Sequence, residues 1–114
     1  MNAKKAYTAA TAIRDIQRGR PEKALKPLEK LIKDAPDNPA LWNLKGVALG
    51  MIGDHEGSLA CYEKVLTTDP DPAVYWNNKG LALQNLGRYA EAEEMYKQAL
   101  ERDPESLEAR YNLA

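Results

Sequence analysis

Few side chains in this sequence have the type and spacing that catalysis requires. His55 is the only histidine and Cys61 the only cysteine, and neither has a partner residue at the spacing of a known motif. A nucleophile needs an adjacent base, and a metal site needs several ligands. We therefore expect His55 to pack partly between helices and Cys61 to act as a small apolar side chain.

The acidic residues do not indicate a catalytic pair either. Glu91, Glu93 and Glu94 form a short run of charge that is typical of the solvated face of a helix. The sequence contains no glycine-rich phosphate-binding motif and no His-Glu-x-x-His pattern. The prediction is a protein without enzymatic activity, cofactor or metal.

Composition and charge indicate an ordinary globular protein. The chain has 114 residues, 44% of them hydrophobic and 29% charged, and no apolar run long enough to span a bilayer. A net charge of -1 gives no electrostatic reason to expect nucleic acid as a partner. The N-terminal residues lack the apolar core of a signal peptide. We expect a cytoplasmic protein that binds neither membranes nor nucleic acid.

A repeated pattern orders most of the chain. A shift of 34 residues places one stretch on an earlier one, with these identical pairs among others: Trp42 and Trp76, Gly46 and Gly80, Tyr62 and Tyr96, and Pro70 and Pro104. Before Trp42 the pattern persists in a weaker form, since Gly19 aligns with Gly53 and Pro36 with Pro70. The weaker copy is typical of a terminal, capping repeat.

The pattern resembles the tetratricopeptide repeat, whose period is also 34 residues and whose consensus is W-x2-L-G-x2-Y, A-x3-F, P. The matching stretch here is Trp76-x2-Lys79-Gly80-x2-Leu83, then Ala92-x3-Tyr96 and Pro104. Three of these residues depart from the consensus, and the middle repeat departs from it in the same way. The resemblance implies an all-α fold, a right-handed superhelical solenoid of antiparallel helix pairs. The repeats would occupy about 5–38, 39–72 and 73–106, with a partial fourth repeat or capping helix at 107–114.

Capping and turn residues locate the helices. The expected ranges are roughly 3–18, 21–33, 39–52, 54–67, 72–86, 88–102 and 107–114. Asn38, Asp54 and Asp71 precede three of them as N-caps, and Asp103 or Ser106 begins the last.

Glycine and proline inside these helices make further predictions. Gly46 and Gly80 lie within helices, where glycine is unfavourable, so we expect another backbone to come close there, with Ala92 as a small partner. Gly87 marks a turn between helices. Pro27 removes one helical hydrogen bond and is expected to kink its helix.

In this family the first helix of each pair lines a concave wall. The resemblance places there Ala6, Ala9, Ile13, Ile16, Gln17, Ala40, Asn43, Val47, Gly50, Met51, Val74, Asn77, Leu81, Gln84, Asn85, Glu108 and Tyr111. Glu108 is the only charged residue among them, which predicts an uncharged groove of amide and apolar groups. The candidate partner-binding residues are Ile13, Gln17, Asn43, Val47, Met51, Val74, Asn77, Leu81, Gln84, Asn85 and Tyr111.

Two interpretations of these residues stay open. Val47 and Leu81 are compatible either with a ligand groove or with packing between neighbouring first helices. Asn77, which recurs as Asn43, suits a ligand backbone, but it would equally brace the neighbouring helix.

The best-known ligand of the family is a chaperone's C-terminal Glu-Glu-Val-Asp tail, which is held by a clamp of Lys, Arg and Asn. In one frame the clamp positions are Ala9, Ile13, Leu44, Val74 and Asn78, and in the next they are Asn43, Val47, Asn78, Glu108 and Asn112. Only Asn78 fits, and no cation is available to pair with a carboxylate. We do not expect this chain to bind such a tail.

The resulting prediction is a protein-interaction scaffold for a peptide or a partner protein. An alternative is a homo-oligomer formed through an open edge of the last helix, with Tyr111 and Leu113. Residues 1–38 hold 9 Lys/Arg and 5 Asp/Glu, whereas residues 73–114 hold 5 and 7, so opposite charges at the two ends would favour head-to-tail contact. A further alternative is a regulatory fragment of a larger multidomain protein.

Overall fold

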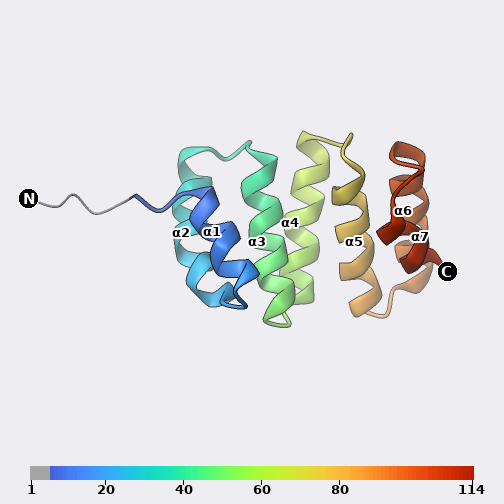
Figure 1. The fold of residues 1–114 in the computed structure, drawn as a ribbon, viewed down its shortest axis with the longest axis horizontal. Helices are drawn as coiled ribbons and strands as arrows, with labels where there is room; N and C mark the ends of the chain where they lie inside the picture. Colours follow the sequence, from blue (N-terminus) through green and yellow to red (C-terminus); the bar gives the residue numbers. More distant parts are fainter. Residues whose placement is uncertain (1–5) are drawn as a thin grey trace, which may run out of the picture.

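The computed structural model describes residues 6–114, which form seven helices and no strand (Figure 1). The helices are α1 (Ala9–Gln17), α2 (Pro21–Asp34), α3 (Pro39–Met51), α4 (His55–Thr68), α5 (Ala73–Asn85), α6 (Tyr89–Arg102) and α7 (Leu107–Leu113). None of the seven is long and apolar enough to cross a membrane.

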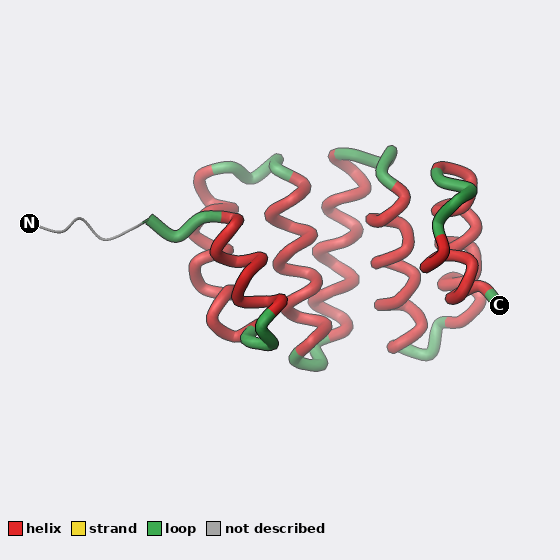
Figure 2. Tube along the Cα trace, in the orientation of Figure 1, coloured by secondary structure: helices red, strands yellow, loops and turns green. Residues whose placement is uncertain are grey.

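Successive helices form antiparallel pairs that stack side by side into an elongated array (Figure 2). Each helix contacts the helices immediately before and after it, and the first helices of adjacent pairs also touch: α1 with α3, α3 with α5, and α5 with α7. Contacts confined to neighbours are the defining property of a solenoid. The fold predicted from the repeat pattern is therefore confirmed.

Buried side chains gather in two clusters along the array. The first lies between α1, α2 and α3 and includes Ala12, Leu28 and Leu41. The second lies between α4, α5 and α6 and includes Tyr62 and Tyr96. Val47 of α3 and Leu113 of α7 pack against the second cluster, so α3 contributes to both.

A tyrosine ring lies directly on a glycine in the second and third pairs. A Cβ atom on Gly46 would stand 2.6 Å from Cε1 of Tyr62, and one on Gly80 would stand 2.5 Å from Cε1 of Tyr96. The returning helix also comes close at this place, since the hydroxyl of Ser58, which stands where Ala92 does in the next repeat, donates to the carbonyl oxygen of Gly46 at 2.7 Å. The close approach expected from the glycines is present, but the missing Cβ makes room for a tyrosine ring, which the sequence analysis did not identify.

A side chain in the first helix of the second pair, and its equivalent in the third, donates a hydrogen bond to the loop before that helix. Nε1 of Trp42 donates to the carbonyl oxygen of Pro36, and Nε1 of Trp76 donates to that of Pro70, both at 2.7 Å. At the equivalent place in α7, Nη2 of Arg110 donates to the carbonyl oxygen of Pro104, also at 2.7 Å. A donor at this position thus recurs three times, although the residue type changes.

Most helices begin at the predicted capping residues. Asn38 and Asp54 accept backbone N–H groups as N-caps, as expected. Ser106 caps the last helix, and it was one of the two predicted options. Gly87 has φ 78°, so the turn predicted there is confirmed. α2 continues through Pro27 without a break.

Two predicted helix starts were wrong. α5 begins at Ala73 with Pro72 as its N-cap, so Asp71 does not cap it; the Asp71 amide instead donates to the side chain of Asp69. α1 begins at Ala9, because Thr8 is its N-cap: the Thr8 hydroxyl accepts a hydrogen bond from the Thr11 amide. Residues 6–8 are consequently not helical, and the rest of the predicted start lies outside the described residues.

The glycine contact can be tested on a single helix. Gly46→Ala should lower the free energy of unfolding by about 1–2 kcal/mol, because the Tyr62 ring is 5% exposed and cannot move away from the added Cβ. Gly50→Ala on the same helix should be neutral or stabilising by up to about 1 kcal/mol, since the nearest atom to its Cβ, Oγ of Ser58, would be 3.4 Å away. Urea unfolding followed by circular dichroism measures both. Equal stability of the two variants would contradict this account.

Candidate functional site

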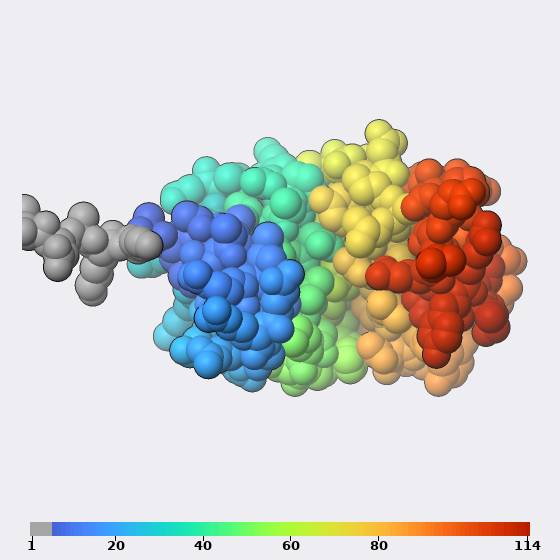
Figure 3. All heavy atoms as spheres, in the orientation of Figure 1, coloured from blue at the N-terminus to red at the C-terminus, as the bar shows by residue number. Residues whose placement is uncertain are grey.

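The predicted partner-binding residues all belong to the first helices of the pairs, α1, α3, α5 and α7. Figure 3 shows the face on which the atoms of α1 and α7 stand in front of the helices between them, so that this face is hollowed between its ends. The second helices, α2, α4 and α6, form the other side of each pair.

Apolar side chains are exposed on this face. Eight large hydrophobic side chains are exposed among the described residues, and five of them are predicted groove residues: Ile13, Met51, Val74, Leu81 and Tyr111. A sixth, Leu107, also lies on α7. Since apolar side chains that face solvent together mark interaction surfaces more often than chance, this face is the candidate site.

A hollow lies on this face between α5 and α7. It has a volume of about 550 Å³ and is lined by Asn77, Asn78, Leu81, Leu107, Glu108, Tyr111 and Asn112. Tyr111 is 83% exposed and Leu107 is 77% exposed, so their apolar surfaces are open to a ligand. Glu108 is the only charged group in the lining, and no lysine or arginine contributes to it.

Asparagine side chains link the first helices beneath this hollow. Nδ2 of Asn78 donates to Oδ1 of Asn43 at 2.9 Å, and Nδ2 of Asn112 donates to Oδ1 of Asn77 at 3.0 Å. Nδ2 of Asn77 also donates to Oε2 of Glu108 at 3.5 Å. Asn77 is 2% exposed, so its amide is engaged in bracing the next helix, one of the two roles left open by the sequence.

The other predicted residues divide between packing and solvent. Val47 is half-buried and packs against the second core cluster. Oε1 of Gln84 accepts a hydrogen bond from the Tyr96 hydroxyl at 2.7 Å, and burial raises the pKa of Tyr96, so this donor remains protonated at neutral pH. Gln17 and Asn85 are exposed and Asn43 is half-buried. The structure thus gathers Asn77, Leu81 and Tyr111 into one hollow, while Ile13 and Gln17 lie at the other end of the face.

Four lining residues were absent from the candidate partner-binding set: Asn78, Leu107, Glu108 and Asn112. Glu108 was predicted on the concave wall, and the other three were not. Asn78 and Asn112 stand 35 residues after Asn43 and Asn77, one more than the repeat period, and this spacing is the signal that would have paired them. Leu107 is the first residue of α7 and was expected only as a helix start.

No group in the described residues suggests chemistry at the site. Cys61 is buried away from it, and burial raises the pKa of its thiol. His55 is half-buried at the start of α4. Within residues 6–114, no three His, Cys, Asp or Glu side chains are placed to hold a metal ion.

Comparisons with known families agree with the repeat geometry. Residues 9–73 match a family model described as tetratricopeptide repeat, and residues 73–106 match a second model of the same description. The chain belongs to the tetratricopeptide repeat (TPR) family. No protein of curated function matches the sequence.

Solved TPR structures share the fold. The first TPR domain of human RPAP3 superposes with a TM-score of 0.88 at 19% identity, over 92% of this chain and 83% of that one. The Sgt2 TPR domain from Aspergillus fumigatus gives 0.86 at 23% identity, over 92% and 71%. The second TPR domain of human RPAP3, in complex with an HSP70 peptide, gives 0.86 at 19% identity, over 91% and 87%. At these identities the likeness concerns the fold.

The bracing role of Asn77 predicts coupling with Asn112. Asn77→Ala and Asn112→Ala should each lower the free energy of unfolding, by about 1–3 kcal/mol for the buried Asn77, because a partner amide is left unpaired. The double variant should lose less than the sum of the single losses, by about 0.5 kcal/mol or more. Asn85→Ala, at an exposed position of the same helix, should stay within about 0.5 kcal/mol of the parent. Additive losses in urea unfolding would show that the two amides do not act together.

Proposed function

We propose that this TPR chain is a non-enzymatic scaffold that binds a segment of a partner protein on the face formed by α1, α3, α5 and α7. The observation that carries the proposal is the grouping of exposed apolar side chains at the predicted groove positions, five of the eight in the described residues. Two solved relatives support the mode of action, since TPR domains of RPAP3 are described in complex with an HSP90 peptide and with an HSP70 peptide.

The chemistry of the α5–α7 hollow defines what the segment would carry. Leu81, Leu107 and Tyr111 offer apolar contact, so the ligand presents at least one apolar side chain. Glu108 offers a carboxylate, which favours a lysine, an arginine or an amino terminus nearby. The amides of Asn77 and Asn112 hold the two helices together and shape the hollow. The proposed ligand is a short basic and apolar peptide segment.

This preference is opposite to that of the related structures. The peptides in the RPAP3 complexes are SRMEEVD and SGPTIEEVD, both of which end in Glu-Glu-Val-Asp. The hollow here has no cation to pair with such a tail and one carboxylate that would repel it. The proposal therefore keeps the sequence prediction that this chain does not bind such an acidic tail.

A peptide-library pulldown followed by fluorescence anisotropy tests this function. Peptides that pair a basic residue with apolar residues should be enriched, and Leu81→Glu or Tyr111→Ser should weaken their binding by about tenfold or more. Glu108→Lys should reduce binding of the basic peptides and not that of uncharged ones. Tyr89→Ser provides the control, because Tyr89 is 68% exposed but lies on α6, outside the hollow. Binding that survives both Leu81→Glu and Tyr111→Ser would disprove the assignment.

Self-association is a second candidate, favoured by the exposure of Leu107 and Tyr111 on α7, 77% and 83% respectively. Leu113, which the sequence placed on the same open edge, instead packs against the core. A second copy would cover the two exposed side chains with an apolar surface of its own.

Light scattering at several protein and salt concentrations separates the two candidates. Self-association predicts a mass that rises with concentration and falls to the monomer value in Leu107→Ser/Tyr111→Ser. A constant monomer mass at high concentration would exclude it and leave the peptide scaffold.

A further inference from the structure

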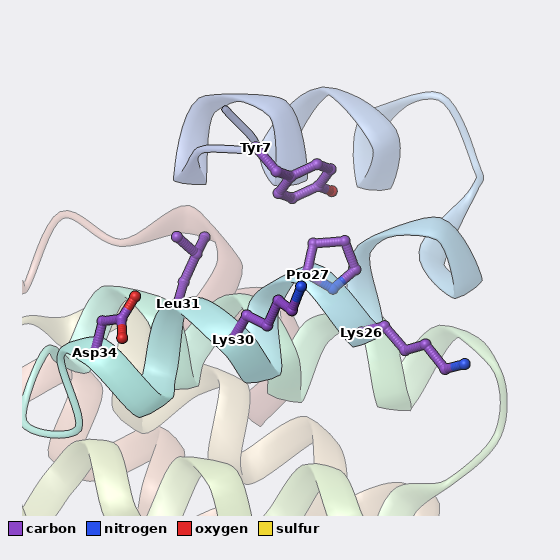
Figure 4. A pocket seen from close by; sticks show the side chains of 6 residues that line it. All are labelled: Tyr7, Lys26, Pro27, Lys30, Leu31 and Asp34. Carbon is purple, nitrogen blue, oxygen red and sulfur yellow. The ribbon is translucent and has the colours of Figure 1, made fainter. Parts of the chain in front are cut away.

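The opposite end of the array carries a separate hollow, on α2. It has a volume of about 490 Å³ and is lined by Tyr7, Lys26, Pro27, Lys30, Leu31 and Asp34. Figure 4 shows Tyr7 above, with Pro27, Lys30 and Leu31 on the helix below it. None of these residues belongs to the face that carries the proposed peptide site.

The hollow exists because α1 is shorter than its equivalents. α3 begins at Pro39 and α5 at Ala73, 34 residues later, whereas α1 begins only at Ala9. In an antiparallel pair the first turn of one helix lies opposite the last turns of the other. The missing turn of α1 therefore leaves the last turns of α2, around Leu31 and Asp34, with no helical turn opposite them among the described residues, and Tyr7 lies over the hollow instead.

The position of Leu31 is closed in the later repeats. Leu31 corresponds to Val65 and Ala99, both 0% exposed, whereas Leu31 is only half-buried. Pro27 is half-buried, as is its equivalent Met95 in the third repeat, whereas Cys61 in the second is 4% exposed. The first repeat thus differs from the later ones mainly at Leu31, which they bury completely.

The lining mixes apolar and charged groups along α2. Pro27, Leu31 and the Tyr7 ring supply the apolar part. Lys26 stands at one end of the row and Lys30 lies between Pro27 and Leu31 (Figure 4), and neither lysine forms an ion pair with any residue in 6–114. Asp34 lies at the other end of the row (Figure 4).

Tyr7 is held in place over this hollow. Its hydroxyl donates to Oδ2 of Asp15 at 2.9 Å. Burial, together with that hydrogen bond, raises the pKa of Tyr7 to about 12, so the phenol stays a neutral donor at physiological pH. The ring is therefore a fixed apolar wall and does not compete for the lysines.

We propose that this hollow is a second binding site, which takes a short segment of a partner protein in which an apolar side chain follows acidic residues. The apolar side chain enters between Tyr7 and Leu31, and the acidic residues pair with Lys26 and Lys30. Asp34 fixes the direction, since it would repel acidic residues placed at its end. The chain's own first residues, Met-Asn-Ala-Lys-Lys, carry cations and no acid, so their charge does not complement the two lysines.

A pair of labelled peptides tests the proposal. The first carries aspartate and glutamate before a tryptophan and a leucine, and the second has asparagine and glutamine in their place. Fluorescence anisotropy should show the acidic peptide binding at least about tenfold more tightly, with an affinity that falls as salt rises. Amide NMR shifts on binding should gather at Tyr7, Lys30 and Leu31.

Charge-reversal variants locate the contact. Lys26→Glu/Lys30→Glu should weaken the acidic peptide by about tenfold or more. Lys23→Glu is the matched control, because Lys23 is exposed on α2 but does not line the hollow, and it should have a much smaller effect. Circular dichroism confirms that each variant is folded.

Three outcomes would overturn the proposal. They are no binding of the acidic peptide, an equal loss of binding in Lys26→Glu/Lys30→Glu and in the Lys23→Glu control, or NMR shifts centred on Leu81 and Tyr111. A concentration-dependent mass that the lysine double variant abolishes would show that a second copy occupies the hollow, and would also overturn it. Because the two sites lie on different helices, Leu81→Glu should leave acidic-peptide binding intact whether or not the proposed groove function holds.

Discussion

The form of this protein depends on the contact between each helix pair and the next. The donor that reaches back to a proline carbonyl, from Trp42, Trp76 and Arg110, fixes how one pair follows another along the chain. The asparagine pairs fix how closely the first helices approach. A single arrangement that is applied again after each 34-residue step produces an array in which each helix pair contacts only its neighbours. For this reason the tyrosine and glycine of the second and third pairs can be identical while the surfaces vary.

The same contacts decide which groups remain for recognition. Amides that would suit a ligand backbone, above all Asn77, already make hydrogen bonds within the array. The exposed face therefore retains mainly apolar side chains and the carboxylate of Glu108, which is the basis for proposing a basic and apolar ligand. The first repeat differs, because Thr8 caps α1 early and a hollow lies beside Lys26 and Lys30, which form no ion pair within residues 6–114. The two proposed sites thus carry charged groups of opposite sign at the two ends of the array.

The repeat pattern of the sequence was sufficient for the fold and for most helix boundaries. Asn38, Asp54 and Gly87 act locally, so their roles can be derived from neighbouring residues alone. The start of α1 could not be derived in this way, because a helical first turn and a Thr8 cap compete and both are compatible with the local sequence. Gly46 showed that something comes close but not what, since a ring and a backbone make the same demand for space. The pairing of Asn77 with Asn112 needed the relative rotation of two helices, which the repeat period does not contain.

The division of the buried side chains into two clusters joined through α3 has a consequence for how the molecule loses its structure. Since α2 makes no direct contact with α4 among the described residues, the two clusters are coupled through α3 alone. In an array of this kind stability is a sum over repeats and their interfaces, so a terminal repeat can open while its neighbours stay folded. We expect the first pair, with its shortened helix and its lysine-lined hollow, to be the part that opens most easily.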